Sequence, residues 1–125
     1  MTMENLKPGQ SAELEVEVTK EMSINRMGGE GNDVLSTPDL LRLMEECSIK
    51  ATDPYLPAGH ATVGYAVDGL RHLAPTSVGR IVRLTAVLTE LDRNRLTYSI
   101  EAFEVDKKIG VAVHKRAVVS KETGA

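Results

Sequence analysis

A single amphipathic helix among strands is the feature that most constrains the fold of this chain. The helix signals come together: Ser36 or Thr37 can serve as the N-cap, and Pro38 follows at the first helical position, where its missing N–H costs nothing. Apolar residues then recur at i, i+4, i+7 and i+11 until Pro54 stops the run. They are Leu40, Met44, Cys47 and Ala51. We therefore expect a helix whose apolar stripe packs against a sheet.

The rest of the chain has the pattern of strands joined by short turns. Apolar and acidic residues alternate over 12–18, which is typical of a strand with one buried and one solvated face. Four further strands are predicted, connected as a meander, over 62–71, 78–91, 96–105 and 108–120. A hairpin turn at 92–95 joins the second of these to the third. In the first of these we expect a bulge, because Gly64, Asp68 and Gly69 interrupt it. This order predicts an α+β fold, with an antiparallel five-stranded sheet wrapped around one central helix.

Length and composition predict one small domain over residues 1–125. The chain has a mass of 13.6 kDa and only 3% aromatic residues, so aliphatic side chains must form most of the core. No run approaches the roughly 20 apolar residues that cross a bilayer, and residues 1–10 lack the layout of a signal peptide. We expect a cytoplasmic protein with no membrane partner.

Charge and cysteine content exclude several classes of partner. A net charge of −3, with one Phe and no Trp, gives little attraction to nucleic acid and little material for stacking bases. Cys47 is the only cysteine, which excludes an intrachain disulfide and a cysteine-based zinc site. The three histidines show no metal-ligand spacing. We expect neither a nucleic-acid partner nor a metal.

Two segments suggest where a binding site and a subunit contact lie. Residues 25–33 contain Gly28, Gly29 and Gly31 with little periodicity, which makes this connection a candidate lid. On the helix, Glu45 projects about 120° from the centre of the apolar stripe, at a border that is itself partly apolar. A subunit partner would bury such a border, so a symmetric dimer follows as a hypothesis.

His72 places a titratable imidazole at the end of a predicted strand. A histidine there is a candidate proton-transfer group, and the alternative is a structural or solvated histidine. His60 and His114 are interpreted as structural or surface groups. Spacing alone does not distinguish these readings for His72, so the other groups of the chain must be considered with it.

Several short motifs follow one another in a characteristic order between Val34 and Ser120. They are Leu35-Ser36-Thr37, Leu43-Met44-Glu45, Pro54-Tyr55-Leu56, His72-Leu73-Ala74-Pro75-Thr76 with Val78-Gly79, and Ile109-Gly110 with His114-Lys115-Arg116-Ala117-Val118. Each motif is short, but their order and spacing resemble the hotdog-fold thioesterases, and among these the fluoroacetyl-CoA thioesterase-like group.

The resemblance implies both an activity and a site. Matched to the family pattern, Thr37, Glu45 and His72 are the catalytic set. The resemblance also implies an acyl-CoA thioester as the substrate class, no cofactor, and a homodimer with active sites at the subunit interface, with dimer or tetramer left open. Eight helical residues rise about 12 Å, so Thr37 and Glu45 cannot touch on one straight helix. Either Thr37 lies off the helix or two subunits share the site.

Thioester hydrolysis needs a nucleophile and donors for the oxyanion. We expect His72 to act as general base or hydrogen-bond partner, Glu45 to orient it or to serve as nucleophile or water-activating base, and Thr37 to act as nucleophile or substrate positioner. In the plainer alternatives Thr37 is only an N-cap and Glu45 is an exposed carboxylate. The oxyanion of the substrate would accept hydrogen bonds from backbone N–H groups. The candidates are those at the helix start and those of residues 62–64, which end at Gly64. Candidate contacts to the CoA phosphates are Lys115 and Arg116.

The chain departs from the family pattern in two places. It holds one residue more between Gly64 and His72, which the bulge expected near Asp68-Gly69 would absorb. Its glycine-rich loop stands where the fluoroacetate-specific enzyme has aromatic lid residues, so fluoroacetyl specificity is not inferred. Two other functions stay open for this fold: a non-catalytic acyl-CoA-binding hotdog protein, and a hotdog enoyl hydratase or dehydratase.

Overall fold

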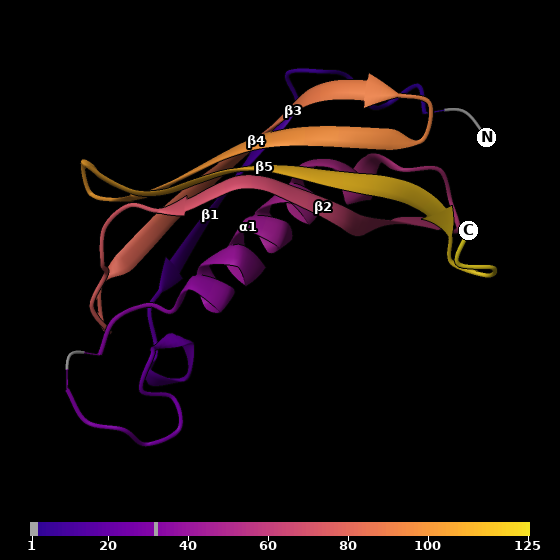
Figure 1. Cartoon of the computed structure of the whole chain (residues 1–125). Helices are drawn as coiled ribbons and strands as arrows, with labels where there is room; N and C mark the ends of the chain where they lie inside the picture. Colours follow the sequence, from indigo (N-terminus) through magenta and orange to yellow (C-terminus); the bar gives the residue numbers. More distant parts are fainter. Residues whose placement is uncertain (1–2, 32) are drawn as a thin grey trace.

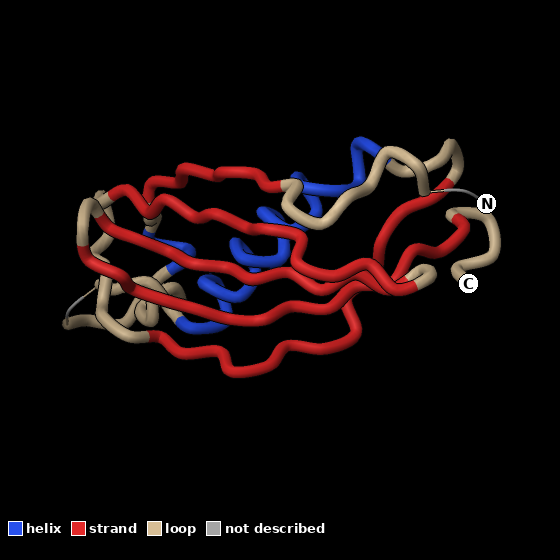
Figure 2. The backbone as a smooth tube through the Cα atoms, turned by 90° about the horizontal axis from the view of Figure 1, so that it is seen from above, coloured by secondary structure: helices blue, strands red, loops and turns tan. Residues whose placement is uncertain are grey.

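Five strands and one long helix make up the part of the chain that the computed structural model describes, residues 3–31 and 33–125. In chain order they are β1 (Ser11–Glu17), α1 (Thr37–Thr52), β2 (His60–His72), β3 (Ile81–Asp92), β4 (Arg95–Glu104) and β5 (Lys107–Ser120). Two short 3-10 helices, η1 (Lys20–Met22) and η2 (Asp53–Tyr55), lie before and after α1. The strands curve over α1 as one sheet (Figure 1 and Figure 2). The predicted α+β class is confirmed.

The strands lie in the order β1-β3-β4-β5-β2, and every neighbouring pair is antiparallel. The predicted meander is correct for β3, β4 and β5 but wrong for β2, which pairs with β5 instead of β3. Alternation and turn residues identify strands but do not say which strands become neighbours. The connection from β2 to β3 crosses to the other side of the sheet and is held by residues that precede α1. Leu35 N donates to Thr76 O at 2.8 Å and Val78 N to Asp33 O at 2.9 Å.

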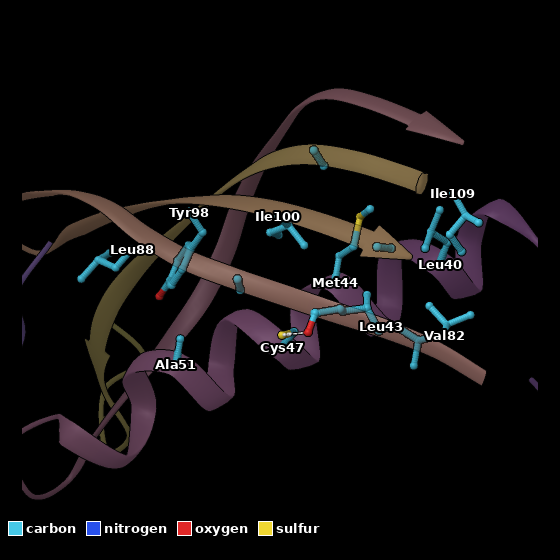
Figure 3. Close-up of a cluster of buried hydrophobic side chains, with 14 of the residues drawn as sticks. Leu40, Leu43, Met44, Cys47, Ala51, Val82, Leu88, Tyr98, Ile100 and Ile109 are labelled. Carbon is cyan, nitrogen blue, oxygen red and sulfur yellow. Dashed lines mark hydrogen bonds between the residues drawn. The ribbon is translucent and has the colours of Figure 1, made fainter. Parts of the chain in front are cut away.

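The core lies between α1 and the concave face of the sheet. The predicted helix stripe is confirmed, since Leu40, Met44, Cys47 and Ala51 are each at most 1% exposed. Figure 3 shows these α1 side chains between the helix and the strands. Tyr98 is the large buried aromatic side chain of the cluster, and its hydroxyl lies 2.6 Å from Thr52 Oγ1. Burial raises the pKa of Tyr98 to about 12. None of the helices in the described ranges is long and apolar enough to span a membrane.

The expected bulge in β2 is present. Asp68 pairs with Val113 and Arg71 with Val111, so β2 holds one extra residue over this stretch. Gly69, with a φ of 60°, adopts the left-handed conformation that the bulge requires. A second register shift lies between Gly64 and Ala66. The bulge absorbs one residue before the strand ends, and it thereby sets the face on which His72 emerges.

Candidate active site

Thr37 and His72 meet at the start of α1 and the end of β2. Thr37 Oγ1 lies 2.8 Å from His72 Nδ1, which is hydrogen-bonding distance. Thr37 is the first residue of α1, and the N-cap is Ser36, whose Oγ accepts from Asp39 N at 3.2 Å. The hydroxyl of Thr37 is therefore free of capping and available to the imidazole.

The surroundings of His72 favour the neutral ring. Burial lowers its pKa below the ordinary 6.5, because the charged form loses solvation. A neutral imidazole can accept a proton at Nδ1 from the Thr37 hydroxyl. Its Nε2 is buried and has no hydrogen-bond partner within the described residues. This ring therefore has one nitrogen engaged with a hydroxyl and a second nitrogen that requires a partner.

Glu45 lies in a second group of residues, with Arg116 and His114 of β5. Glu45 Oε2 is 3.5 Å from Arg116 Nη1 and 3.8 Å from His114 Nε2. Gly64 of β2 completes this group and leaves the space that it needs. A Cβ at position 64 would lie 3.0 Å from His114 Cε1, 3.2 Å from Arg116 Nη1 and 3.3 Å from Glu45 Oε2. A side chain at position 64 would thus press on all three neighbours, which favours glycine here.

The two groups are far apart within one chain. Thr37 and Glu45 are both on α1, where eight residues rise about 12 Å. On the sheet, Gly110 pairs with His72 and Arg116 pairs with Gly64. The steps from 110 to 116 along β5 span roughly 20 Å. The structure thus brings Thr37 and His72 together, but it does not bring Glu45 to them.

Lys115 and Arg116 point to opposite faces of the sheet, as neighbours in a strand must. Arg116 is 4% exposed on the face toward α1, whereas Lys115 is on the outer face, 3.7 Å from Asp68 Oδ2. The guanidinium of Arg116 is occupied by bonds within the protein. The two side chains therefore cannot bind the same phosphate group.

Surface hollows adjoin both groups. One of about 360 Å³ lies beside Thr37 and His72 and is bordered by Ile24, Val34 and Pro75. The other, of about 320 Å³, lies beside Glu45 and is bordered by Gly64, Tyr65 and His114. The candidate lid, residues 25–33, begins directly after Ile24; Asn32 of that segment lies outside the described residues.

Of the two interpretations of His114 from the sequence, structural or surface, the structural one agrees with its burial, but its place beside Glu45 was not predicted. It is 2% exposed, and it lies within the Glu45 group. A signal was present, since residues 114 and 116 are two apart on a strand and must share a face. The side chain of Thr62 was also not predicted to take part, because only its backbone N–H had been considered. Its Oγ1 accepts from Arg116 Nε at 2.7 Å.

A five-stranded antiparallel sheet in this order, wrapped around one central helix, defines the hotdog fold. A variant of the fluoroacetyl-CoA-specific thioesterase, solved with fluoroacetate and CoA, superimposes with a TM-score of 0.84 at 27% identity and covers 94% of this chain and 98% of that one. A thioesterase superfamily protein from Thermus thermophilus gives 0.85 at 29%, with 95% and 88% covered. The sequence profile of the family described as fluoroacetyl-CoA-specific thioesterase matches residues 18–122. The chain belongs to this family.

The curated fluoroacetyl-CoA thioesterase of Streptantibioticus cattleyicolor is a sequence relative. It is 33% identical over 90 residues, which make up 72% of this chain. The match spans 64% of the length of that relative. The expected family resemblance is confirmed by these comparisons.

Proposed function

We propose that this protein is an acyl-CoA thioesterase, which uses water to convert an acyl-CoA into the free acid and CoA. The observation that carries the proposal is the 2.8 Å contact between Thr37 Oγ1 and His72 Nδ1 in a member of a thioesterase family. A hydroxyl paired with a neutral imidazole is the arrangement that activates an oxygen nucleophile. Non-catalytic acyl binding would not need such a pair.

In the proposed reaction His72 is the base. In the covalent route its Nδ1 takes the proton of the Thr37 hydroxyl as this oxygen attacks the thioester carbonyl, and water later hydrolyses the acyl-Thr37 ester, which releases the acid and restores the hydroxyl. In the water route the attacking water gives its proton to Thr37 Oγ1 while the Thr37 proton passes to Nδ1. The same proton can then pass to the departing CoA sulfur. Thr37 lies at the positive end of the α1 dipole, which favours the negative charge that develops on the carbonyl oxygen. Trapping an acyl group on Thr37 would distinguish covalent attack from water attack.

We further propose that two copies share each site. β2 is an edge strand, and Val63 and Tyr65 on it are 48% and 47% exposed. Among the described residues, Asp53 covers this edge at Thr62, where its Oδ2 accepts from Thr62 N at 3.1 Å. The edge beyond Thr62 is therefore open to pairing with a second β2.

Antiparallel pairing of two β2 strands about a two-fold axis near Asp68 would place Gly64 of one copy opposite His72 of the other, since 64 and 72 are equidistant from 68. Glu45 of one copy would then approach His72 Nε2 of the other. The carboxylate would accept from Nε2–H and hold the ring in the tautomer whose Nδ1 is free to act as base. The buried, unpartnered Nε2 supports this arrangement.

The proposed substrate is an acyl-CoA, without the fluoroacetyl restriction, because Gly28, Gly29 and Gly31 occupy the candidate lid. Lys115 is proposed as a contact to the CoA phosphates from the outer face, and Gly64 and Arg116 as part of the acyl side of the site. A cytoplasmic location is proposed on the sequence grounds given above.

A thiol-release assay over a panel of acyl-CoA chain lengths tests the proposed activity. Wild type should release free CoA, and His72→Ala and Glu45→Ala should each lose about a hundredfold or more in kcat. A protein that hydrolyses no member of the panel is not a thioesterase of this class. Conversion of an enoyl thioester, followed by its absorbance, would instead indicate a hydratase.

A further inference from the structure

His114 lies in a buried hydrogen-bond network whose donor directions are all fixed. Arg116 cannot accept a hydrogen bond, so each of its contacts is a donation. Nε donates to Thr62 Oγ1 at 2.7 Å, Nη2 to Thr62 O at 3.0 Å and Nη1 to His114 Nε2 at 3.0 Å. Thr62 Oγ1 in turn donates to Asp53 Oδ1 at 2.7 Å. The guanidinium is thus held by Thr62 on one side and by His114 on the other.

These directions determine the protonation of His114. Because Nε2 accepts from Arg116, it carries no proton, and the ring proton must be on Nδ1. Nδ1 then donates to the backbone carbonyl of Ala66 at 2.9 Å. Burial is the main cause that lowers the pKa of His114, and the charge of Arg116 lowers it further. The 3.8 Å approach of Glu45 to Nε2 is therefore not an ion pair, since the ring is neutral.

We infer that His114 is a positioning residue, which as its Nδ1–H tautomer holds Arg116 away from a full ion pair with Glu45 and fixes the β2 backbone at Ala66. This inference rests on the proposed function, in which Glu45 takes part in the reaction. His114 contacts no substrate atom in this role. It acts through Arg116 on one side and through the Gly64–Ala66 irregularity on the other.

The distances support this role. Arg116 Nη1 is 3.0 Å from His114 but 3.5 Å from Glu45, so the histidine has the shorter bond although the carboxylate carries the charge. A guanidinium released from His114 would turn toward Glu45 and form the short, charge-assisted pair that arginine and carboxylate prefer. The charge of Glu45, whose side chain is 40% exposed, would then be paired with Arg116, and the carboxylate would be drawn away from the substrate. The carbonyl of Ala66 would lose its buried donor at the same time.

The tautomer can be measured without any substrate. In ¹⁵N-detected NMR of the histidine side chains, His114 should show a protonated Nδ1 and a bare Nε2, with signals assigned by their loss in His114→Gln. A proton on Nε2 would overturn the inference, whatever the activity of the protein. This readout is independent of the proposed function.

Kinetics then test the positioning. His114→Leu should lower kcat at least about tenfold, as expected for a displaced reacting group, while KM changes by less than about twofold. His114→Gln should restore most of kcat, because its amide can accept from Arg116 and donate to Ala66. Val118→Ala is the matched control, since Val118 is 2% exposed on the same face of β5 and has no polar side chain. It should lower stability and leave kcat unchanged.

The outcomes separate two failures. If wild type hydrolyses acyl-CoA and His114→Leu keeps the wild-type kcat, the inference is wrong and the proposed function stands. A loss of kcat in Val118→Ala equal to that in His114→Leu would assign the effect to general destabilisation and would also overturn it. If wild type hydrolyses nothing, the proposed function itself is wrong.

Discussion

The hydroxyl of Thr37 and the imidazole of His72, 35 positions apart in the sequence, are in hydrogen-bond contact at 2.8 Å. The contact depends on two local features. Ser36 caps α1 and leaves the Thr37 hydroxyl free, and the bulge at Asp68–Arg71 sets the side of β2 from which His72 emerges. Helix capping and strand register together thus create the pair from residues that have no local reason to meet.

Removal of the Thr37 hydroxyl should affect chemistry more than stability. Thr37→Ala should lower kcat about a hundredfold or more, because the group that donates to His72 is lost. Thr37→Ser keeps the hydroxyl and should stay within about tenfold of wild type. Acyl-CoA turnover and thermal unfolding are measured together.

Ser36→Ala is the control for this position. It should cost about 1 kcal/mol of stability through the lost cap, with kcat nearly unchanged. The opposite result would be unchanged stability in Ser36→Ala and unchanged kcat in Thr37→Ala. It would show that Thr37 contributes only to the helix start.

Two inactive variants should complement each other if copies share the sites. A dimer of one His72→Ala chain and one Glu45→Ala chain has one site with both substitutions and one site with neither. Random mixing makes half of the dimers mixed, so the mixture should recover about a quarter of wild-type activity. Turnover is measured after the purified variants are exchanged. Absence of any recovery, with mixed dimers demonstrated by a tag, would place each site within one chain.

Gly64→Ala should crowd the Glu45 group. The added Cβ would lie within 3.3 Å of atoms of His114, Arg116 and Glu45, and the buried ring cannot retreat. Overpacking of this kind costs about 1–3 kcal/mol, and we expect kcat to fall about tenfold as Glu45 is displaced.

Gly59→Ala is a matched control for this prediction. Its φ of 77° strains any other residue, yet an added Cβ would meet nothing within 4 Å. It should lose about 1–2 kcal/mol of stability with normal kcat. Equal activity in the two variants would argue against a role for the space at Gly64.

Local patterns in the sequence were sufficient to predict the elements of the fold. Pro38 and the apolar stripe determine α1, and alternation determines the strands, because these signals report only on neighbours a few residues away. The place of β2 beside β5 could not be predicted, since it depends on a long connection and not on a turn. Similarly, Thr37, Glu45 and His72 were predicted as site residues through family motifs, while their division into two groups required three-dimensional distances.

His114 illustrates the same limit at the level of one side chain. In the sequence it is one of three histidines with no distinctive spacing. Its significance comes from burial and from Arg116 two residues later, whose guanidinium requires an acceptor. Alternation along β5 indicated that the two share a face, but only the fold shows that this face is closed by α1 and Glu45.

Lowering the pH should destabilise the protein through its buried histidines. Burial lowers the pKa of both His72 and His114 below 6.5, so the unfolded chain binds their protons more readily than the folded protein does. The contribution of these two histidines to the free energy of unfolding should therefore be fully present above pH 6.5. It should decrease as the pH falls below that value. Urea unfolding of wild type and His114→Gln between about pH 7 and pH 5 measures this slope. The variant cannot gain a proton at this position, so its stability should depend less steeply on pH. Parallel curves for the two proteins would show that His114 is protonated equally in the folded and unfolded states, contrary to the neutral ring that its contact with Arg116 requires.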